Sequence, residues 1–337
     1  MIVVNTIIIL CILIFVHELG HLAAAKLSKV RVNEFAIGMG PAFFKRQWGE
    51  TQYSLRVFPI GGFCALEGED EDSEDSRSMN NKPAYIRAFV LASGSLMNVI
   101  LAILIMSAII FYAGTSLSTT VKEVGAESPA LSAGILPGDK IVEIDGADIS
   151  EWGDILREIT GSPNDRLSIV VIRNGERIPV LTEVAKAEDG RKIIGIIPEV
   201  KRNPLTALAL GTKASYDMIV NMANILRQLF TGDVPVSGMS GPVGIAGIID
   251  EFAKAGFRPL LYLVALISLN LAIINMLPFP ALDGGRLVFL VIRKITGRAV
   301  TDSMEAKIHL VGMALLLLLM VYVTWNDIMR LINGAQG

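Results

Sequence analysis

The segment "FVHELGHLAA", residues 15–24, places two histidines and a glutamate inside an apolar stretch. His17, Glu18 and His21 fall within residues 1–25, and about 20 predominantly apolar residues are enough to cross a bilayer. Ionisable side chains in hydrocarbon are costly, and where they occur they commonly mark a functional site. The position of these three residues therefore indicates chemistry within a membrane helix.

The spacing of the motif predicts a zinc site. In His-Glu-x-x-His on a helix, the two imidazoles lie one turn apart on one face. His17 and His21 can then bind one Zn²⁺ at Zn–N distances of about 2.0–2.1 Å. Glu18 points to another side and cannot be the third ligand, but it is placed to take a proton from the attacking water. Because a membrane helix has no structural use for three such residues in one turn, a chance match is disfavoured.

The composition supports a membrane protein. The chain has 337 residues, and 52% of them are hydrophobic even without glycine. Soluble proteins average roughly 45–50% apolar residues with glycine counted. The formal net charge of -3 gives no support for nucleic acid binding. Cys11 and Cys64 lie in different segments, so no disulfide framework is expected. No basic residue precedes Lys26, so the first apolar run is interpreted as a retained helix rather than a signal peptide.

Apolar runs and polar segments divide the chain into parts. We predict a polytopic α-helical membrane protein with four transmembrane helices, a membrane-associated β-hairpin or sheet, and an inserted soluble α+β domain. The predicted transmembrane helices are residues 1–25, 88–113, 260–285 and 306–327. The predicted connecting parts are a loop at 26–87, the inserted domain at 118–200, and an interfacial amphipathic helix with a glycine-rich loop at 203–257.

The loop 26–87 combines a β segment with an acidic run. Residues 51–68, "TQYSLRVFPIGGFCALEG", are rich in aromatic and β-branched residues, and Gly61–Gly62 is expected to form the turn. Residues 67–78, "EGEDEDSEDSRS", are expected to form a solvated loop. Lys and Arg residues are frequent here and after the third span, so both segments are expected on the cytoplasmic side. The inserted domain and both termini are then outside.

Two residues are candidates for a third zinc ligand, namely Asp283 and His309. Both lie at the cytoplasmic membrane face, so topology does not separate them. The local sequence favours Asp283, because Pro278 and Pro280 break the helix before it and Gly284–Gly285 allows a tight turn after it. Irregular backbone at membrane depth is tolerated where it lines a cavity or is buried in protein. His309 is interpreted as an interfacial histidine at the start of the fourth span.

These motifs together resemble a known family. HELGH in a first span, a soluble insert, and Asn275-x-x-Pro278-x-Pro280-x-Leu282-Asp283-Gly-Gly are similar to the site-2 proteases, which are intramembrane zinc metalloproteases. Residues 128–149, "SPALSAGILPGDKIVEIDGADI", resemble a PDZ domain. The match is nearest to the bacterial group that carries a PDZ domain and acts in regulated intramembrane proteolysis.

The resemblance implies roles for individual residues. His17, His21 and Asp283 would bind one catalytic Zn²⁺, and Glu18 would be the catalytic acid and base. Asn98 ends the stretch Gly-Ser-Leu-Met-Asn, where the family often has proline in place of the serine. Further residues would bind substrate or support the site, although asparagines inside spans also serve to join helices. They are Asn98, Asn270, Asn275, Pro278, Pro280, Gly61, Gly62 and Phe63.

The implied function is cleavage of transmembrane segments. The implied substrates are single-span proteins, such as membrane-bound anti-sigma factors after a first external cut, or remnant signal peptides. The location would be the bacterial cytoplasmic membrane, with the active site near its cytoplasmic side. The PDZ-like domain would either bind a peptide or C-terminus by strand addition or act as a size filter. A metal-ion transporter and an inactive PDZ membrane adaptor remain as alternatives. The well-placed general base and the small number of spans disfavour the first, and the intact motifs disfavour the second.

Overall fold

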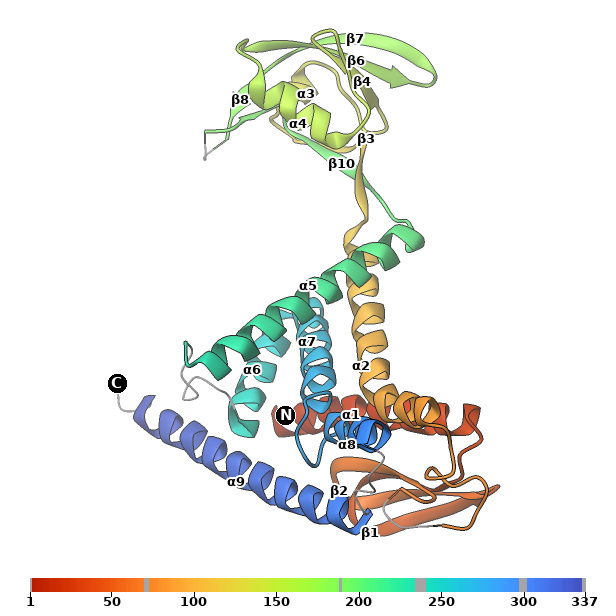
Figure 1. The fold of residues 1–337 in the computed structure, drawn as a ribbon. Coiled ribbons are helices and arrows are strands. Elements are labelled where there is room, and N and C mark those ends of the chain that lie inside the picture. Colours follow the sequence, from red (N-terminus) through yellow and green to blue (C-terminus); the bar gives the residue numbers. More distant parts are fainter. Residues whose placement is uncertain (1, 70–72, 188–189, 234–240, 297–301, 335–337) are drawn as a thin grey trace. The chain divides into compact units, whose positions relative to one another are not determined.

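The computed structural model describes residues 2–69, 73–187, 190–233, 241–296 and 302–334. The chain divides into two compact units. The helical unit comprises Met1–Ile109 and Gly211–Gly337, and the inserted unit comprises Ile110–Leu210. Each unit has its own hydrophobic core (Figure 1).

Four helices among the described residues are long and apolar enough to cross a membrane, which confirms the predicted polytopic membrane fold. They are α1 (Ile2–Leu27), α2 (Ala84–Ala113), α7 (Phe257–Asn275) and α9 (Asp302–Gly334). Apart from two short helices in the inserted unit, the described residues form three further helices. They are α5 (Pro204–Thr231), α6 (Pro242–Ala255) and α8 (Asp283–Thr296).

The segment expected as a third span, 260–285, contains a break. Helix α7 ends at Asn275, and α8 begins at Asp283. The connection at 276–282, here called the metal loop, holds Pro278 and Pro280. Proline lacks a backbone N–H and clashes with the preceding turn, so the helix cannot continue through it. Asp283 therefore opens a new helix instead of lying near the end of the third span.

The segment 203–257 also differs from expectation. Helix α5 is present, but the part expected as a glycine-rich loop becomes helix α6 from Pro242 onward. Proline at the first helical position explains this start, because its missing N–H would have no partner there anyway. The buried carboxylate of Asp327 on α9 accepts a hydrogen bond of 2.8 Å from the N–H of Gly244 in the first turn of α6. Residues 234–240 lie outside the described residues.

The loop after α1 forms a long hairpin of β1 (Val32–Trp48) and β2 (Thr51–Leu66). Its hairpin turn lies at 49–50, whereas Gly61 and Gly62, where the turn was expected, lie inside β2. Gly61 has φ of 86°, and the chain reverses direction between Leu55 and Gly62: residues 52–55 run along 34–37 of β1 in the same direction, and residues 62–66 run along 32–37 in the opposite direction. Because of this reversal, Phe35 of β1 pairs with both Tyr53 and Cys64, and the segment that follows Gly61 becomes an edge strand.

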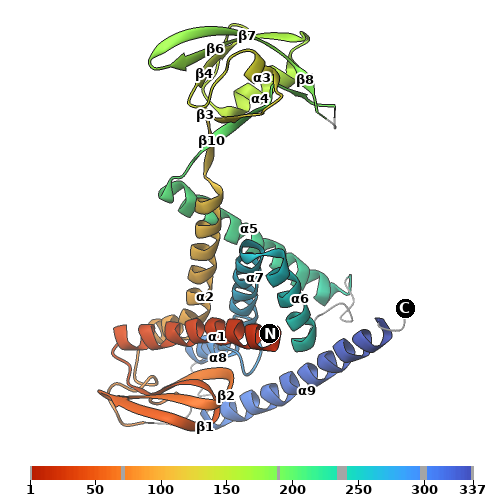
Figure 2. The ribbon, with the colours of Figure 1, turned by 180° about the vertical axis from the view of Figure 1, so that it is seen from behind.

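Helix α1 lies against this hairpin in both views of the molecule (Figures 1 and 2). Buried residues at the end of α1 and the start of β1 pack against α2 and form one core. The acidic run lies partly outside the described residues, since 70–72 are not described.

The inserted unit is built on antiparallel strands and two short helices. Its main sheet has the order β10-β3-β4-β6-β7, with β5 paired to β4, and β8 pairs with β9. The strands are β3 (Ser116–Val124), β4 (Lys140–Ile144), β5 (Ala147–Asp148), β6 (Arg166–Arg173), β7 (Glu176–Glu183), β8 (Ala185–Lys186), β9 (Lys192–Ile193) and β10 (Ile196–Lys201); the helices are α3 (Pro129–Ser132) and α4 (Trp152–Gly161). Isoleucines from β4, β6 and α4 fill its core, as expected for a separate α+β domain.

A buried ion pair joins the start of β4 to the end of β6. Arg173 Nε and Nη2 donate to the Asp139 carboxylate at 2.8 and 2.7 Å, and the N–H of Leu136 donates to it at 2.9 Å. Burial raises the pKa of Asp139, but these hydrogen bonds outweigh burial and hold the pKa below its usual range. The stabilisation is therefore present above the ordinary carboxyl pKa and is lost as pH falls through the lowered value.

We expect Asp139→Asn to loosen the inserted unit, because it removes the charge that Arg173 pairs with inside the fold. Amide hydrogen exchange in β4 and β6 of the full-length protein should become about 10-fold faster at neutral pH. Glu183→Gln is the matched control, since its pair with Arg166 is exposed on both sides. Equal exchange rates in the two variants would contradict a stabilising role for the Asp139 pair.

Candidate metal centre

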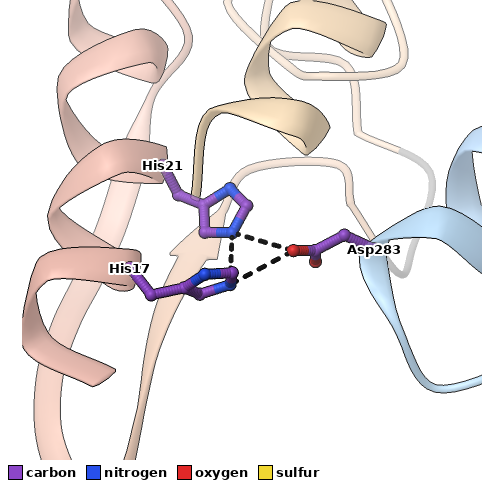
Figure 3. A group of neighbouring side chains, drawn as sticks. All are labelled: His17, His21 and Asp283. Carbon is purple, nitrogen blue, oxygen red and sulfur yellow. Dashed lines mark hydrogen bonds and ion pairs between the residues drawn. The ribbon is translucent and has the colours of Figure 1, made fainter. Parts of the chain in front are cut away.

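Three predicted ligands converge in the helical unit. His17 and His21 project from α1, and Asp283 is the first residue of α8 (Figure 3). Asp283 Oδ2 lies 3.2 Å from His17 Nε2 and 3.4 Å from His21 Nε2, and the two Nε2 atoms are 3.3 Å apart. Among the described residues, this is the one group of three or more His, Cys, Asp or Glu side chains that could hold a metal ion.

The geometry fits zinc. Ligand atoms about 2.0–2.1 Å from a tetrahedral zinc ion lie about 3.3 Å from each other, which matches all three separations. No hydrogen bond from the described residues reaches Asp283 Oδ2, although this oxygen is buried. A buried anionic oxygen of this kind calls for a cation. Two imidazole nitrogens and one carboxylate oxygen also form a donor set typical of catalytic zinc, with one position open.

His21 is held in the form that a metal requires. Its Nδ1 lies 2.9 Å from the carbonyl oxygen of Val90 on α2. A carbonyl can only accept, so Nδ1 carries the proton and donates. The lone pair of Nε2 then faces the centre, as in most histidine ligands.

Asn98 on α2 holds the other histidine. Its amide nitrogen lies 3.4 Å from Nδ1 of His17, and its amide oxygen is buried with no partner among the described residues. The two amide ends have nearly the same shape, and with them exchanged the amide oxygen accepts a hydrogen bond from Nδ1–H of His17. Nε2 of His17 is left with its lone pair toward the centre. The backbone oxygen of Asn98 accepts a 2.9 Å hydrogen bond from Ser268, which ties α2 to α7.

Close approach of the backbone explains the glycines after Asp283. A Cβ on Gly284 would lie 2.3 Å from the Leu277 oxygen, and one on Gly285 would lie 2.3 Å from the Phe279 oxygen. Both residues are helical, so the expected tight turn is not the reason for them. They let the metal loop lie directly against the first turn of α8, which aims Asp283 at α1.

Gly94 entered the sequence analysis only as the first residue of the Gly-Ser-Leu-Met-Asn stretch, and no site role was assigned to it. A Cβ there would lie 2.3 Å from His21 Nε2 and 2.7 Å from His17 Nε2. Gly20 is equally close to α2, since its Cβ would lie 2.3 Å from the Ser93 oxygen. Helices α1 and α2 therefore approach each other closely at the two histidines. A glycine within an apolar span is the sequence signal that could have pointed to Gly94.

A cleft opens beside the metal ligands and holds Glu18 in its wall. Asn275 also faces it, with the amide nitrogen 3.3 Å from His17 Nε2. Gly62 of β2 lies opposite, since a Cβ on it would be 3.3 Å from Glu18 Cγ. The lining residues are Ile14, His17, Glu18, Gly61, Gly62, Leu271, Asn275, Ala281, Leu282 and Asp283.

Other residues named from the sequence lie elsewhere. Asn270 is exposed on α7 and does not line the cleft, because five residues turn it about 140° away from Asn275. Phe63 follows Gly62 in the strand and points to the opposite face, where its ring lies 4.7 Å from the Arg56 guanidinium. Pro278 and Pro280 shape the metal loop without lining the cleft.

Comparison with known proteins agrees with this site. Residues 5–319 match the model of peptidase family M50. A chain of Bacillus subtilis named "Regulator of sigma-W protease RasP" is 31% identical over 98% of each chain. A chain of Shouchella clausii named "Zinc metalloprotease RasP" is 30% identical over 96% of this chain and 98% of that one. A solved PDZ domain of an SdrC-like protein from Listeria innocua is similar to 24% of this chain and 93% of that one, at 25% identity and a TM-score of 0.23.

The fold and the site thus define a zinc metalloprotease embedded in a membrane. The chain belongs to peptidase family M50, which confirms the resemblance to site-2 proteases. Zinc as cofactor is likewise confirmed by the relatives.

We expect Gly94→Ala to weaken zinc binding, because the added methyl group would occupy space against both Nε2 atoms. Zinc affinity should fall by roughly 10-fold or more, in the range typical of disturbed metal surroundings. Metal analysis of the purified protein after titration with a chelator measures it. Gly247→Ala is the control, since this glycine is also helical but has open space at the Cβ position. Unchanged affinity in Gly94→Ala would refute the close contact.

Proposed function

We propose that this protein is an intramembrane endopeptidase whose catalytic zinc is held by His17, His21 and Asp283. One observation carries the proposal: the three ligand atoms meet beside a cleft that also contains the carboxylate of Glu18. The ligands come from a membrane-spanning helix and from the helix that follows another span. A soluble domain is not needed to complete the site.

Glu18 is assigned to proton transfer. When bound, zinc supplies the Lewis acidity that makes water nucleophilic at neutral pH. The Glu18 carboxylate accepts the proton that water loses on attack and then delivers it to the leaving amine. Glu18 can do this because it shares the cleft with the ligands without being one of them. The Asn275 amide is placed to donate to the developing oxyanion of the substrate.

The edge strand of the hairpin is assigned to substrate binding. A transmembrane helix hides its peptide bonds in its own hydrogen bonds, so a substrate must unwind before water can attack. The segment after Gly61 pairs with β1 on one edge only and lies against Glu18 at Gly62. An unwound substrate can pair with the other edge by strand addition, and the glycines leave room for its backbone.

The proposed substrates are single-span proteins, including membrane-bound anti-sigma factors already cut outside, and remnant signal peptides. The name of the Bacillus subtilis relative, "Regulator of sigma-W protease RasP", supports the first class. Lys and Arg residues near the hairpin and α8 support a cytoplasmic position for the active site. The inserted unit is then external, where it would limit access to substrates that have lost bulky external domains.

Glu18→Gln should bind zinc as the parent protein does but cleave a single-span reporter roughly 100-fold to 10,000-fold more slowly, because only the proton acceptor is removed. Asp283→Asn should lose zinc and cleavage together, because the charge that balances the dication is gone. Metal content and reporter cleavage are measured on the same preparations. Glu251→Gln, at an exposed position on α6, is the control. Cleavage at the parent rate by Glu18→Gln would refute its role, and full zinc in Asp283→Asn would refute the ligand set.

Deletion of residues 118–200 should leave zinc content unchanged, because all three ligands lie in the helical unit. Reporters that still carry a folded external domain should now be cleaved, whereas the full-length protein should reject them. Loss of zinc from an otherwise helical deletion variant, or continued rejection of these reporters, would contradict the filter.

A further inference from the structure

The metal loop contains a strained residue. Ala281 has φ of 77°, although it is not a glycine and lies only two residues before Asp283. Side chains with a Cβ rarely adopt this left-handed region, and such strain persists only where surrounding contacts enforce it. Some other part of the protein must therefore hold Ala281 in place.

His309 on α9 provides the main polar contact. Its Nδ1 accepts a hydrogen bond of 2.7 Å from the N–H of Ala281. The opposite nitrogen, Nε2, lies 3.6 Å from Glu305 Oε1, and Glu305 also forms an ion pair with Arg293 of α8. Because Nδ1 accepts this hydrogen bond, the ring proton lies on Nε2, which faces the Glu305 carboxylate. The imidazole also lies beside the Phe289 ring, at 5.6 Å between centroids.

A second contact lies one helical turn further along α9. A Cβ on Gly312 would be 2.5 Å from Pro280 Cβ and 2.6 Å from the Pro280 oxygen. Residues three apart on a helix share a face. His309 and Gly312 thus lie on one face of α9, and this face contacts two consecutive residues of the metal loop, Pro280 and Ala281.

We propose that His309 is a positioning residue for the metal centre: its hydrogen bond to Ala281 holds the metal loop in the strained conformation that presents Asp283 to His17 and His21. This inference rests on the ligand set of the proposed function. His309 is not itself a ligand, since Nδ1 is occupied by the loop and Nε2 faces Glu305. Without the Nδ1 acceptor, the N–H of Ala281 has lost its hydrogen bond. The strain of the left-handed backbone at Ala281 is then no longer offset by that bond. The loop then relaxes and withdraws Asp283 from the two imidazoles.

The test compares zinc retention in full-length variants purified in detergent. His309→Ala should release zinc to a chelator roughly 10-fold to 100-fold faster than the parent protein, as is typical when groups that orient metal ligands are lost. His309→Asn should retain zinc nearly as well as the parent, because the amide oxygen can replace Nδ1 as acceptor. Leu310→Ala is the control, since the adjacent Leu310 is 71% exposed on α9 and its loss should have no effect.

Ala281→Gly provides the second arm, because glycine adopts the left-handed region without strain. In this background, the loss of His309 should accelerate zinc release less than it does in the parent. Gly312→Ala should accelerate release while keeping the hydrogen-bond acceptor, because the added methyl group displaces Pro280. Helix content by circular dichroism identifies any variant that has not folded.

Three outcomes would overturn the inference. They are zinc release from His309→Ala at the parent rate, equal release from His309→Ala and His309→Asn, and an undiminished effect of His309→Ala when residue 281 is glycine. The second outcome would assign the effect to ring packing on Phe289 rather than to the hydrogen bond. Asp283→Asn separates failure of this inference from failure of the proposed function. If it loses zinc while His309→Ala keeps zinc, the ligand set stands and only the positioning role is wrong.

Discussion

The helical unit depends on bringing one buried carboxylate against two imidazoles. Asp283 Oδ2 lies within 3.4 Å of both Nε2 atoms, and no hydrogen bond from the described residues satisfies it. An uncompensated charge at such a place is costly, whereas a bound dication turns the same arrangement into a favourable one. Zinc can therefore link the first span to the helix after the third span. Metal binding then stabilises the packing of these two helices.

Small residues make this approach of helices feasible. Gly20 and Gly94 let α1 and α2 cross at the histidines, and Gly284 lets α8 begin directly beneath the metal loop. Lipid tails are as apolar as leucine, so helices in a bilayer associate through close packing and hydrogen bonds rather than through burial of apolar surface. The hydrogen bond of His21 with Val90 joins α1 to α2, and the hydrogen bond of Asn98 with Ser268 joins α2 to α7. The same contacts hold the helices together and orient the ligands.

Two segments of irregular backbone lie beside the cleft. The metal loop and the bent strand at Gly61 interrupt regular structure on two sides of Glu18. Backbone of this kind is tolerated at membrane depth where it is covered by protein or lines a watery cavity. Peptide hydrolysis needs water and an extended substrate, so both interruptions are consistent with the proposed reaction. At Ala281, the metal loop has a left-handed backbone and contacts His309 of α9.

The sequence by itself determined the class of protein and most of the metal centre. Helical spacing puts His17 and His21 on one face, apolar runs mark the spans, and the two prolines before Asp283 interrupt a helix wherever they occur, because each of these effects is local. The fold of the inserted domain was also readable from its own residues.

Other features were decided by the tertiary structure. The hairpin turn proved to lie at 49–50, and the reversal near Gly61–Gly62 proved to lie inside β2, because the pairing of β2 with residues 32–37 of β1 is not visible from β2 alone. Asn270 and Asn275 could not be separated until the rotation of α7 against α1 was known. Gly94 and His309 acquired roles only through contacts with helices distant in sequence. A sequence reports which groups are present and how they repeat, but the distance between His17 and Asp283, separated by most of the chain, is set only when the helices pack.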